Sequence, residues 1–168
     1  MLKPRDIIVL LKVKIWEKNR WTYKELAESL EISSSEVHTS LKNCAKSSLY
    51  INRSRRVLNS ALKEFLIHGI RYSFPAQPGA WVRGIPTAHS AEPLKGMLIA
   101  NQNSSYVWAL KDGQALGQAI EPLHKCVPRV VQKDPAFYQL LSLVDGLRVG
   151  RARELDLASR ELDKIIVT

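Results

Sequence analysis

The 168-residue sequence predicts an α+β protein that is mainly helical. Three observations lead to this prediction. Apolar residues recur at helical spacing in several segments, two of these segments begin with a Ser/Thr-x-x-Glu capping box, and a few short runs of β-forming residues are bounded by Pro, Gly or Asp. A helical N-terminal half should therefore precede a smaller α+β region that ends in two amphipathic helices.

The first helix is expected over residues 4–18. Pro4 suits the first turn, and apolar residues follow on one stripe that ends at Ile15. The apolar run at residues 7–11 is too short and too closely followed by charges to span a membrane, and the N-terminus lacks the features of a secretory signal. We therefore expect a soluble, cytoplasmic protein.

Two capping boxes predict the next two helices. In "TYKE", the Thr22 hydroxyl can cap the Glu25 amide while the Glu25 carboxylate returns to the Thr22 amide, and Ser33 and Glu36 repeat this pattern. The first box opens a short helix that ends near Leu30. The second box opens a helix that should run through the basic segment that follows.

The connection between these two helices is very short, because only Glu31 and Ile32 remain for it. Two helices joined in this way must lie close together, which is the helix-turn-helix arrangement. Their inward-facing residues are expected to be Leu26, Ala27, Leu30, Val37, Leu41 and either Cys44 or Ala45.

Residues 54–68 are expected to form another amphipathic helix, with Gly69 as its C-terminal stop. Two β-type runs, at residues 70–74 and 81–85, then flank "PAQPGA", whose Pro-Gly pair predicts a turn. We expect these runs to pair as a hairpin with one arginine in each arm.

The C-terminal part has a different character, and we place a domain boundary between residues 89 and 90. "SYVWAL" and "QALGQAI" are candidates for a second hairpin around "KDG". Asp134 and Pro135 should begin a helix with a regular apolar stripe, and residues 151–166 should form the last helix. The sequence leaves open whether these two helices are one helix kinked at Gly150.

The distribution of charge is the main functional signal. The formal net charge is +9, and residues 1–90 carry 15 basic and 7 acidic side chains whereas residues 91–168 carry 10 and 9. Residues 37–91 contain eight bases and a single acid, Glu64. A surface without an anionic partner would normally mix both signs, so this asymmetry favours a polyanion-binding face in the first half.

The order of elements over residues 4–85 resembles that of the winged helix-turn-helix DNA-binding proteins, a superfamily of transcription regulators. The resemblance is carried by Leu26, Ala27, Leu30, Ile32, Val37 and Leu41, with the basic run at residues 70–85 in the place of the wing. At the turn position where the family usually has glycine, this sequence has Glu31. The resemblance implies a sequence-specific transcriptional regulator, in the first place a repressor, that binds double-stranded DNA through residues 1–89.

The outward face of the predicted recognition helix supplies the candidate base contacts, because specificity in the major groove comes from such side chains. These candidates are Ser34, Ser35, His38, Thr39, Lys42, Asn43 and Lys46. The candidates for phosphate contacts or for the wing are Arg53, Arg55, Arg56, Arg71 and Arg83. His38 is the preferred single candidate for a base reader.

Other functional classes remain as alternatives. Residues 90–168 would dimerise the protein or bind a partner protein, and an antitoxin-like adaptor that represses its own operon is the main alternative. RNA or single-stranded nucleic acid is the third. Known catalytic and phosphate-loop motifs are absent from the sequence, so we expect no enzyme and no cofactor. Cys44 and Cys126 suggest neither a disulfide nor a metal site, and we expect both to be buried.

Overall fold

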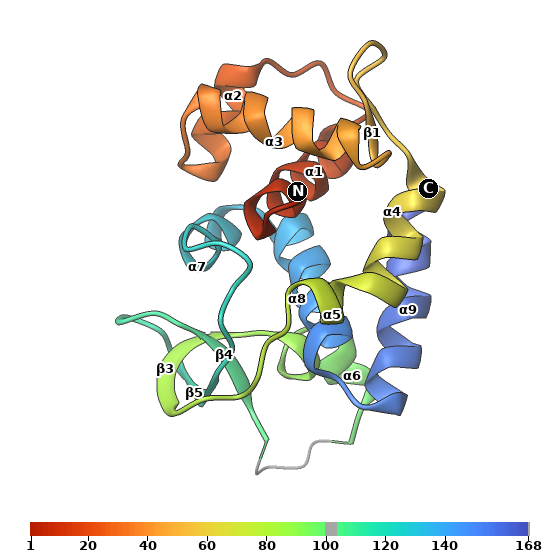
Figure 1. The fold of residues 1–168 in the computed structure, drawn as a ribbon. Helices are drawn as coiled ribbons and strands as arrows, with labels where there is room; N and C mark the ends of the chain where they lie inside the picture. The colour runs from red at the N-terminus through yellow and green to blue at the C-terminus, as the bar shows by residue number, and fades with distance from the viewer. Residues whose placement is uncertain (100–103, 168) are drawn as a thin grey trace. The chain divides into compact units, whose positions relative to one another are not determined.

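The computed structural model describes residues 1–99 and 104–167, and it shows a mainly helical α+β protein with two small sheets (Figure 1). This fold class agrees with the prediction. The chain forms two compact units: unit 1 comprises residues 1–62 and 123–137, and unit 2 comprises residues 63–122 and 138–168. The sequence suggested one boundary near residue 90, whereas each unit contains two separate segments because residues 123–137 return to the N-terminal helices.

Unit 1 contains three N-terminal helices, a short hairpin and a helical turn from the returning segment. Its helices are α1 (Pro4–Trp16), α2 (Tyr23–Leu30), α3 (Ser34–Lys46) and α7 (Val127–Val130), and its strands are β1 (Tyr50–Ile51) and β2 (Arg56–Val57). The strands pair antiparallel, with Tyr50 opposite Val57. Both capping boxes form as predicted, since the Thr22 and Ser33 hydroxyls accept hydrogen bonds from the Glu25 and Glu36 amides at 3.1 Å. The first three predicted helices are therefore confirmed.

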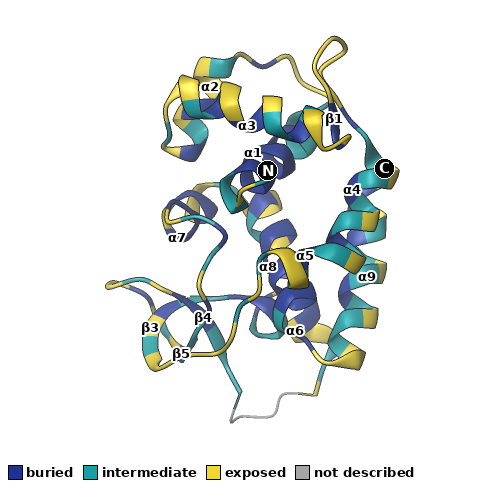
Figure 2. Ribbon diagram, viewed as in Figure 1, coloured by how far each residue is buried: buried dark blue, intermediate teal, exposed yellow. Residues whose placement is uncertain are grey.

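Helix α1 is the central element of unit 1. Its residues from Asp6 to Val13 are all buried, and the two ends of the helix, residues 4–5 and 14–16, are partly exposed (Figure 2). The buried set includes two charged side chains, Asp6 and Lys12. Lys12 forms an ion pair with Asp134, and its ammonium lies 4.9 Å from the centre of the Phe137 ring. The helix is thus covered on all sides, where the sequence suggested a single buried stripe.

The turn between α2 and α3 has the geometry that glycine favours. Glu31 has φ of 53° and ψ of 40°, in the left-handed region, and its amide donates to the carbonyls of Ala27 and Glu28. A left-handed conformation costs about 1–2 kcal/mol for a residue with a Cβ atom. Glu31 also forms an ion pair of 2.7 Å with Arg129, but both side chains are largely exposed, so this pair offsets little of that cost.

The segment after the hairpin differs from the prediction. Residues 54–57 belong to the hairpin turn and β2, so the helix begins only at α4 (Asn59–Glu64). It continues through a π-helical turn at Phe65–Gly69 into α5 (Ile70–Ser73), and Gly69 does not stop it. The expected strand at residues 70–74 is therefore wrong. Leu62, Leu66 and Ile70 recur every four residues and are all buried, so packing of this helical face outweighs the β-type composition.

Unit 2 contains a closed three-stranded sheet. The strands are β3 (Trp81–Pro86), β4 (Tyr106–Ala109) and β5 (Ala115–Ala119). β3 pairs antiparallel with both other strands, and β4 and β5 pair parallel with each other, so neither of the two predicted hairpins forms. Glycines permit this closure. A Cβ on Gly84 would lie 1.9 Å from the Trp108 carbonyl oxygen, and a Cβ on Gly113 would lie 2.4 Å from the Gly84 Cα atom.

Two long helices complete the chain, and they are separate. α8 (Pro135–Val149) begins at Asp134, whose Oδ1 accepts a hydrogen bond of 3.0 Å from the Phe137 amide. Gly150 and the extended Arg151 then separate it from α9 (Ala152–Ile166). The other short helices of unit 2 are α6 (Leu94–Met97) and a 3₁₀ turn at Ala88–Ser90. In the described parts of the chain, none of the helices has the length and apolar character needed to cross a membrane.

A buried polar centre joins the sheet of unit 2 to α8. Asp145 accepts hydrogen bonds from the Thr87 hydroxyl at 2.8 Å and from the Trp108 indole at 2.6 Å, and it forms an ion pair of 2.8 Å with Arg148. Complete burial raises the pKa of Asp145, and these three partners oppose that rise. Arg148 also donates to two backbone carbonyls, those of Phe74 and Glu121.

We expect Asp145→Ala to lower the free energy of unfolding by about 3–5 kcal/mol, because it leaves the Arg148 guanidinium buried without its carboxylate. Urea denaturation measures this change. Asp156→Ala is the matched control: Asp156 pairs with Arg160 at 2.9 Å on an exposed face of α9, and its loss should cost less than about 1 kcal/mol. Equal effects of the two substitutions would contradict the assignment of Asp145 as the polar centre.

Candidate nucleic-acid interface

Helix α3 exposes most of the side chains that the sequence assigned to DNA contact. Val37, Leu41 and Cys44 are buried on one side of the helix. The opposite side is exposed, as the alternating colours of α3 in Figure 2 show. The exposed predicted residues are Ser34, Ser35, His38, Thr39, Lys42 and Lys46. The periodicity of the sequence therefore placed these six side chains on the solvent face.

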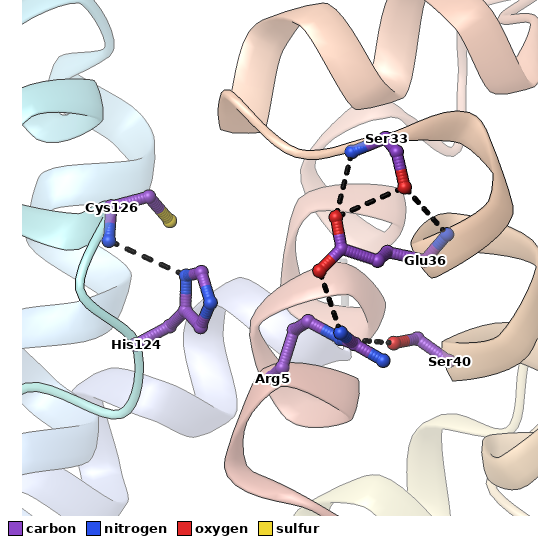
Figure 3. Close-up of polar contacts among 6 residues, drawn as sticks. All are labelled: Arg5, Ser33, Glu36, Ser40, His124 and Cys126. Atoms are coloured by element: carbon purple, nitrogen blue, oxygen red, sulfur yellow. Dashed lines mark hydrogen bonds and ion pairs between the residues drawn. The ribbon is translucent and has the colours of Figure 1, made fainter.

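The start of α3 is held in place by a polar network that includes α1 (Figure 3). The Glu36 carboxylate accepts hydrogen bonds from the backbone and hydroxyl of Ser33, which lower the pKa of Glu36 more than nearby Arg5 does. Its other oxygen lies 2.8 Å from Nη1 of Arg5, whose Nε donates to the Ser40 hydroxyl at 3.3 Å. The first turn of α3 thus has a defined position relative to α1.

Asn43 differs from the other six candidates on α3. It is partly buried, and its amide nitrogen donates a hydrogen bond of 3.0 Å to the Asp6 carboxylate. The backbone amide of Lys3 donates to the same oxygen at 2.8 Å. The structure therefore uses the Asn43 amide within unit 1, to hold α3 against α1.

His38 is positioned by an aromatic cluster that the sequence did not reveal. Its ring stacks on Tyr23 of α2, with 4.5 Å between ring centres and 13° between the ring planes. The Arg55 guanidinium lies 5.1 Å from the ring centres of both Tyr23 and Trp21, and its Nη1 donates to the Trp21 carbonyl at 3.1 Å. The cluster links α2, α3 and the hairpin, and it limits the orientations that the exposed imidazole can adopt.

The β1–β2 hairpin adds three exposed arginines directly after α3: Arg53, Arg55 and Arg56. Over the described residues, Lys42, Lys46, Arg53 and Arg56 have no carboxylate within ion-pair distance. Several acids of unit 1 are meanwhile engaged internally, namely Glu17, Glu25, Glu31, Glu36 and Asp134. Acidic side chains therefore do not balance the positive charges on α3 and the hairpin.

Arg71 and Arg83 were expected together on a wing, and that expectation is wrong. Both belong to unit 2. Arg71 lies on α5, where its Nη2 is 3.5 Å from the Gly150 carbonyl oxygen, and Arg83 is exposed on β3. The hairpin that would have carried both does not form, because residues 70–73 are helical.

The metal-ligating side chains and the two cysteines are the other groups with potential chemistry. No set of three His, Cys, Asp or Glu side chains in residues 1–99 and 104–167 is arranged to hold a metal ion. Cys44 and Cys126 are free and buried, and burial raises the pKa of their thiols to about 12 and about 11. His124, whose Nδ1 accepts from the Cys126 amide at 3.3 Å, has its pKa lowered by burial and then by Arg5 (Figure 3).

No protein-family model matches the chain, and neither a curated protein nor a solved structure is significantly similar to it.

We expect Asn43→Ala to lower the free energy of unfolding by about 1–3 kcal/mol, because the substitution removes a donor from the fully buried Asp6 carboxylate. Thermal or urea denaturation measures the loss. Thr39→Ala is the control, since Thr39 is exposed on the same helix and its replacement should change stability by about 0.5 kcal/mol or less. If the Asn43→Ala protein is as stable as the wild type, the bond to Asp6 is not important for the fold, and Asn43 is again a candidate for base contact.

Proposed function

We propose that unit 1 is a winged helix-turn-helix module that binds double-stranded DNA, and that the protein is a transcriptional regulator acting as a repressor. The observation that carries this proposal is the exposed face of α3, with small hydroxyl residues at its start and uncompensated lysines toward its end. A helix of this kind suits the major groove, where its N-terminal side chains meet base edges.

The hairpin supports the same proposal. Three residues, 47–49, separate α3 from β1, so the hairpin follows the proposed recognition helix directly. This is the position of a wing, and we assign that role to β1–β2 in place of residues 70–85. Arg53 and Arg56 on this hairpin are suited to contact phosphates, which position a protein on the duplex without reading sequence.

A homodimer is part of the proposal. Two copies on a symmetric operator would double the phosphate contacts, and half-site spacing would then reflect the two-fold symmetry of the protein. Selection from a random duplex library at physiological salt tests the proposal most directly. Recovery of a common sequence supports a specific DNA-binding protein, a palindrome supports the dimer, and the absence of any preferred sequence contradicts the proposed function.

The triple variant Lys42→Ala/Lys46→Ala/Arg53→Ala should bind duplex DNA at least about 10-fold more weakly, and its salt dependence should fall by about one unit of slope per lost phosphate contact. Fluorescence anisotropy over a salt series measures both. Lys95→Ala/Lys111→Ala/Arg153→Ala is the matched control, because it removes the same charge from exposed positions of unit 2. If both triple variants lose affinity equally, net charge and not the α3 face is responsible.

His38→Ala should alter the selected sequence at one or two adjacent positions, since a good contact to a base edge discriminates by about 1–3 kcal/mol. Library selection with the variant measures this change. Lys24→Ala, an exposed substitution on α2, should leave the selected sequence unchanged. An identical sequence for His38→Ala and the wild type would exclude His38 as a base reader, although the module would still bind DNA.

A further inference from the structure

Unit 1 contains a cleft of about 660 Å³ between the loop that follows α1 and the β1–β2 hairpin. Figure 1 shows that this loop starts beside the hairpin. The polar side chains that line the cleft are Glu17, Asn19 and Arg20 from the loop side, and Ser54, Arg55 and Arg56 from the hairpin. Three arginines thus line one depression of the surface.

We propose that this cleft is a phosphate-binding site, and that it receives a backbone phosphate of the nucleic acid on which the module acts. The identity of the ligand as DNA rests on the proposed function, whereas the preference for a phosphate group rests on the cleft itself. Arg20 becomes a binding residue that neither its sequence context nor the helix-turn-helix resemblance indicated.

The charge of the cleft supports an anionic ligand. Arg20 and Arg56 are exposed, and in the described chain neither has a carboxylate within ion-pair distance. Among the described lining residues Glu17 is the single acid, and both of its oxygens are engaged: Oε1 accepts from the Val57 amide at 3.2 Å and Oε2 pairs with Lys14 at 2.8 Å. Guanidinium groups match the geometry of phosphate oxygens and bind them in a bidentate manner.

Arg55 has a backbone conformation that is unfavourable for arginine. Its φ is 52°, in the left-handed region that glycine and asparagine favour, yet the hairpin has arginine at this position. Stacking on Trp21 and Tyr23 and the bond to the Trp21 carbonyl hold its side chain. Those contacts use one guanidinium nitrogen, so other N–H donors of this immobilised group remain for a ligand. Residues in strained conformations of this kind concentrate at functional sites.

The chemistry of the other lining residues favours a phosphodiester over a free nucleotide. The Asn19 amide and the Ser54 hydroxyl can each donate a hydrogen bond to a phosphate oxygen. Trp21 is 7% exposed, so it offers little surface on which a base could stack. The cleft therefore provides donors for a phosphate group but little aromatic surface on which a nucleobase could stack.

The test uses the full chain and the duplex recovered by library selection. Arg20→Ala should weaken duplex binding about 3- to 10-fold and reduce the salt slope by about one, with an unchanged selected sequence. Arg55→Gly should weaken binding by a similar factor while the protein keeps its fold, because glycine adopts the left-handed conformation without strain. Glu31→Gly is the matched control, since it replaces another left-handed residue of unit 1 outside the cleft, and its duplex affinity should not fall.

The outcomes separate the two proposals. If Arg20→Ala and Arg55→Gly bind the duplex as the wild type does while the Lys42/Lys46/Arg53 variant is weakened, the phosphate site is wrong and the proposed function stands. If the wild type binds no duplex, the proposed function falls, and titration with inorganic pyrophosphate and with single-stranded DNA decides the site. Binding of either probe that Arg20→Ala weakens then supports a phosphate site of another origin, and binding that does not depend on Arg20 overturns it.

Discussion

The arrangement of unit 1 depends on the buried carboxylate of Asp6. A buried carboxylate costs free energy unless polar groups bond to it, so the hydrogen bonds to Asp6 restrict the registers in which α1 can lie against α3. Both bonds are made to Oδ2, and Oδ1 is buried without a hydrogen-bond partner among the described residues. In this structure the Asn43 amide of α3 is such a partner, and Arg5, one residue earlier on α1, binds Glu36 at the start of the same helix. Lys12 extends the constraint to the segment that returns from unit 2, through Asp134. These pairs define which face of α3 is buried, and hence which residues meet solvent.

Two of the left-handed residues of unit 1, Glu31 before α3 and Arg55 in the hairpin after it, show how local strain and surface chemistry are related. Glu31 shapes the turn before the helix and Arg55 shapes the hairpin after it, and at both positions a glycine would fit the backbone. The exposed ion pair of Glu31 with Arg129 offsets little of the backbone strain at Glu31. Arg55, by contrast, is stacked on two aromatic rings and lines a cleft that contains two further arginines. In the proposed phosphate site, these contacts would also hold the remaining N–H donors of Arg55 in place for a ligand.

In unit 2, too, a buried carboxylate is stabilised by polar partners. The three strands of this unit are short and close on themselves, which requires glycine at the crossing points of the backbone. Trp108 and Asp145 then lie in the interior, and the indole, the Thr87 hydroxyl and Arg148 satisfy the carboxylate. Because each donor comes from a different part of the chain, this centre makes the folding of the sheet and of α8 interdependent.

The sequence alone determined the elements whose signals are local. Three helices were identified from the capping boxes at Thr22 and Ser33 and from the proline at the start of α1. The apolar spacing of α3 identified the exposed face that carries the candidate contacts. Tertiary structure decided the rest, because the deciding interactions join residues far apart in the chain. Burial of Ile70 with Leu62 and Leu66 converted a β-type run into helix, and close backbone crossings at Gly84 set the strand pairing. The inward role of Asn43, the stacking of His38 on Tyr23 and the arginine cleft likewise depend on partners that no periodicity in the sequence reveals.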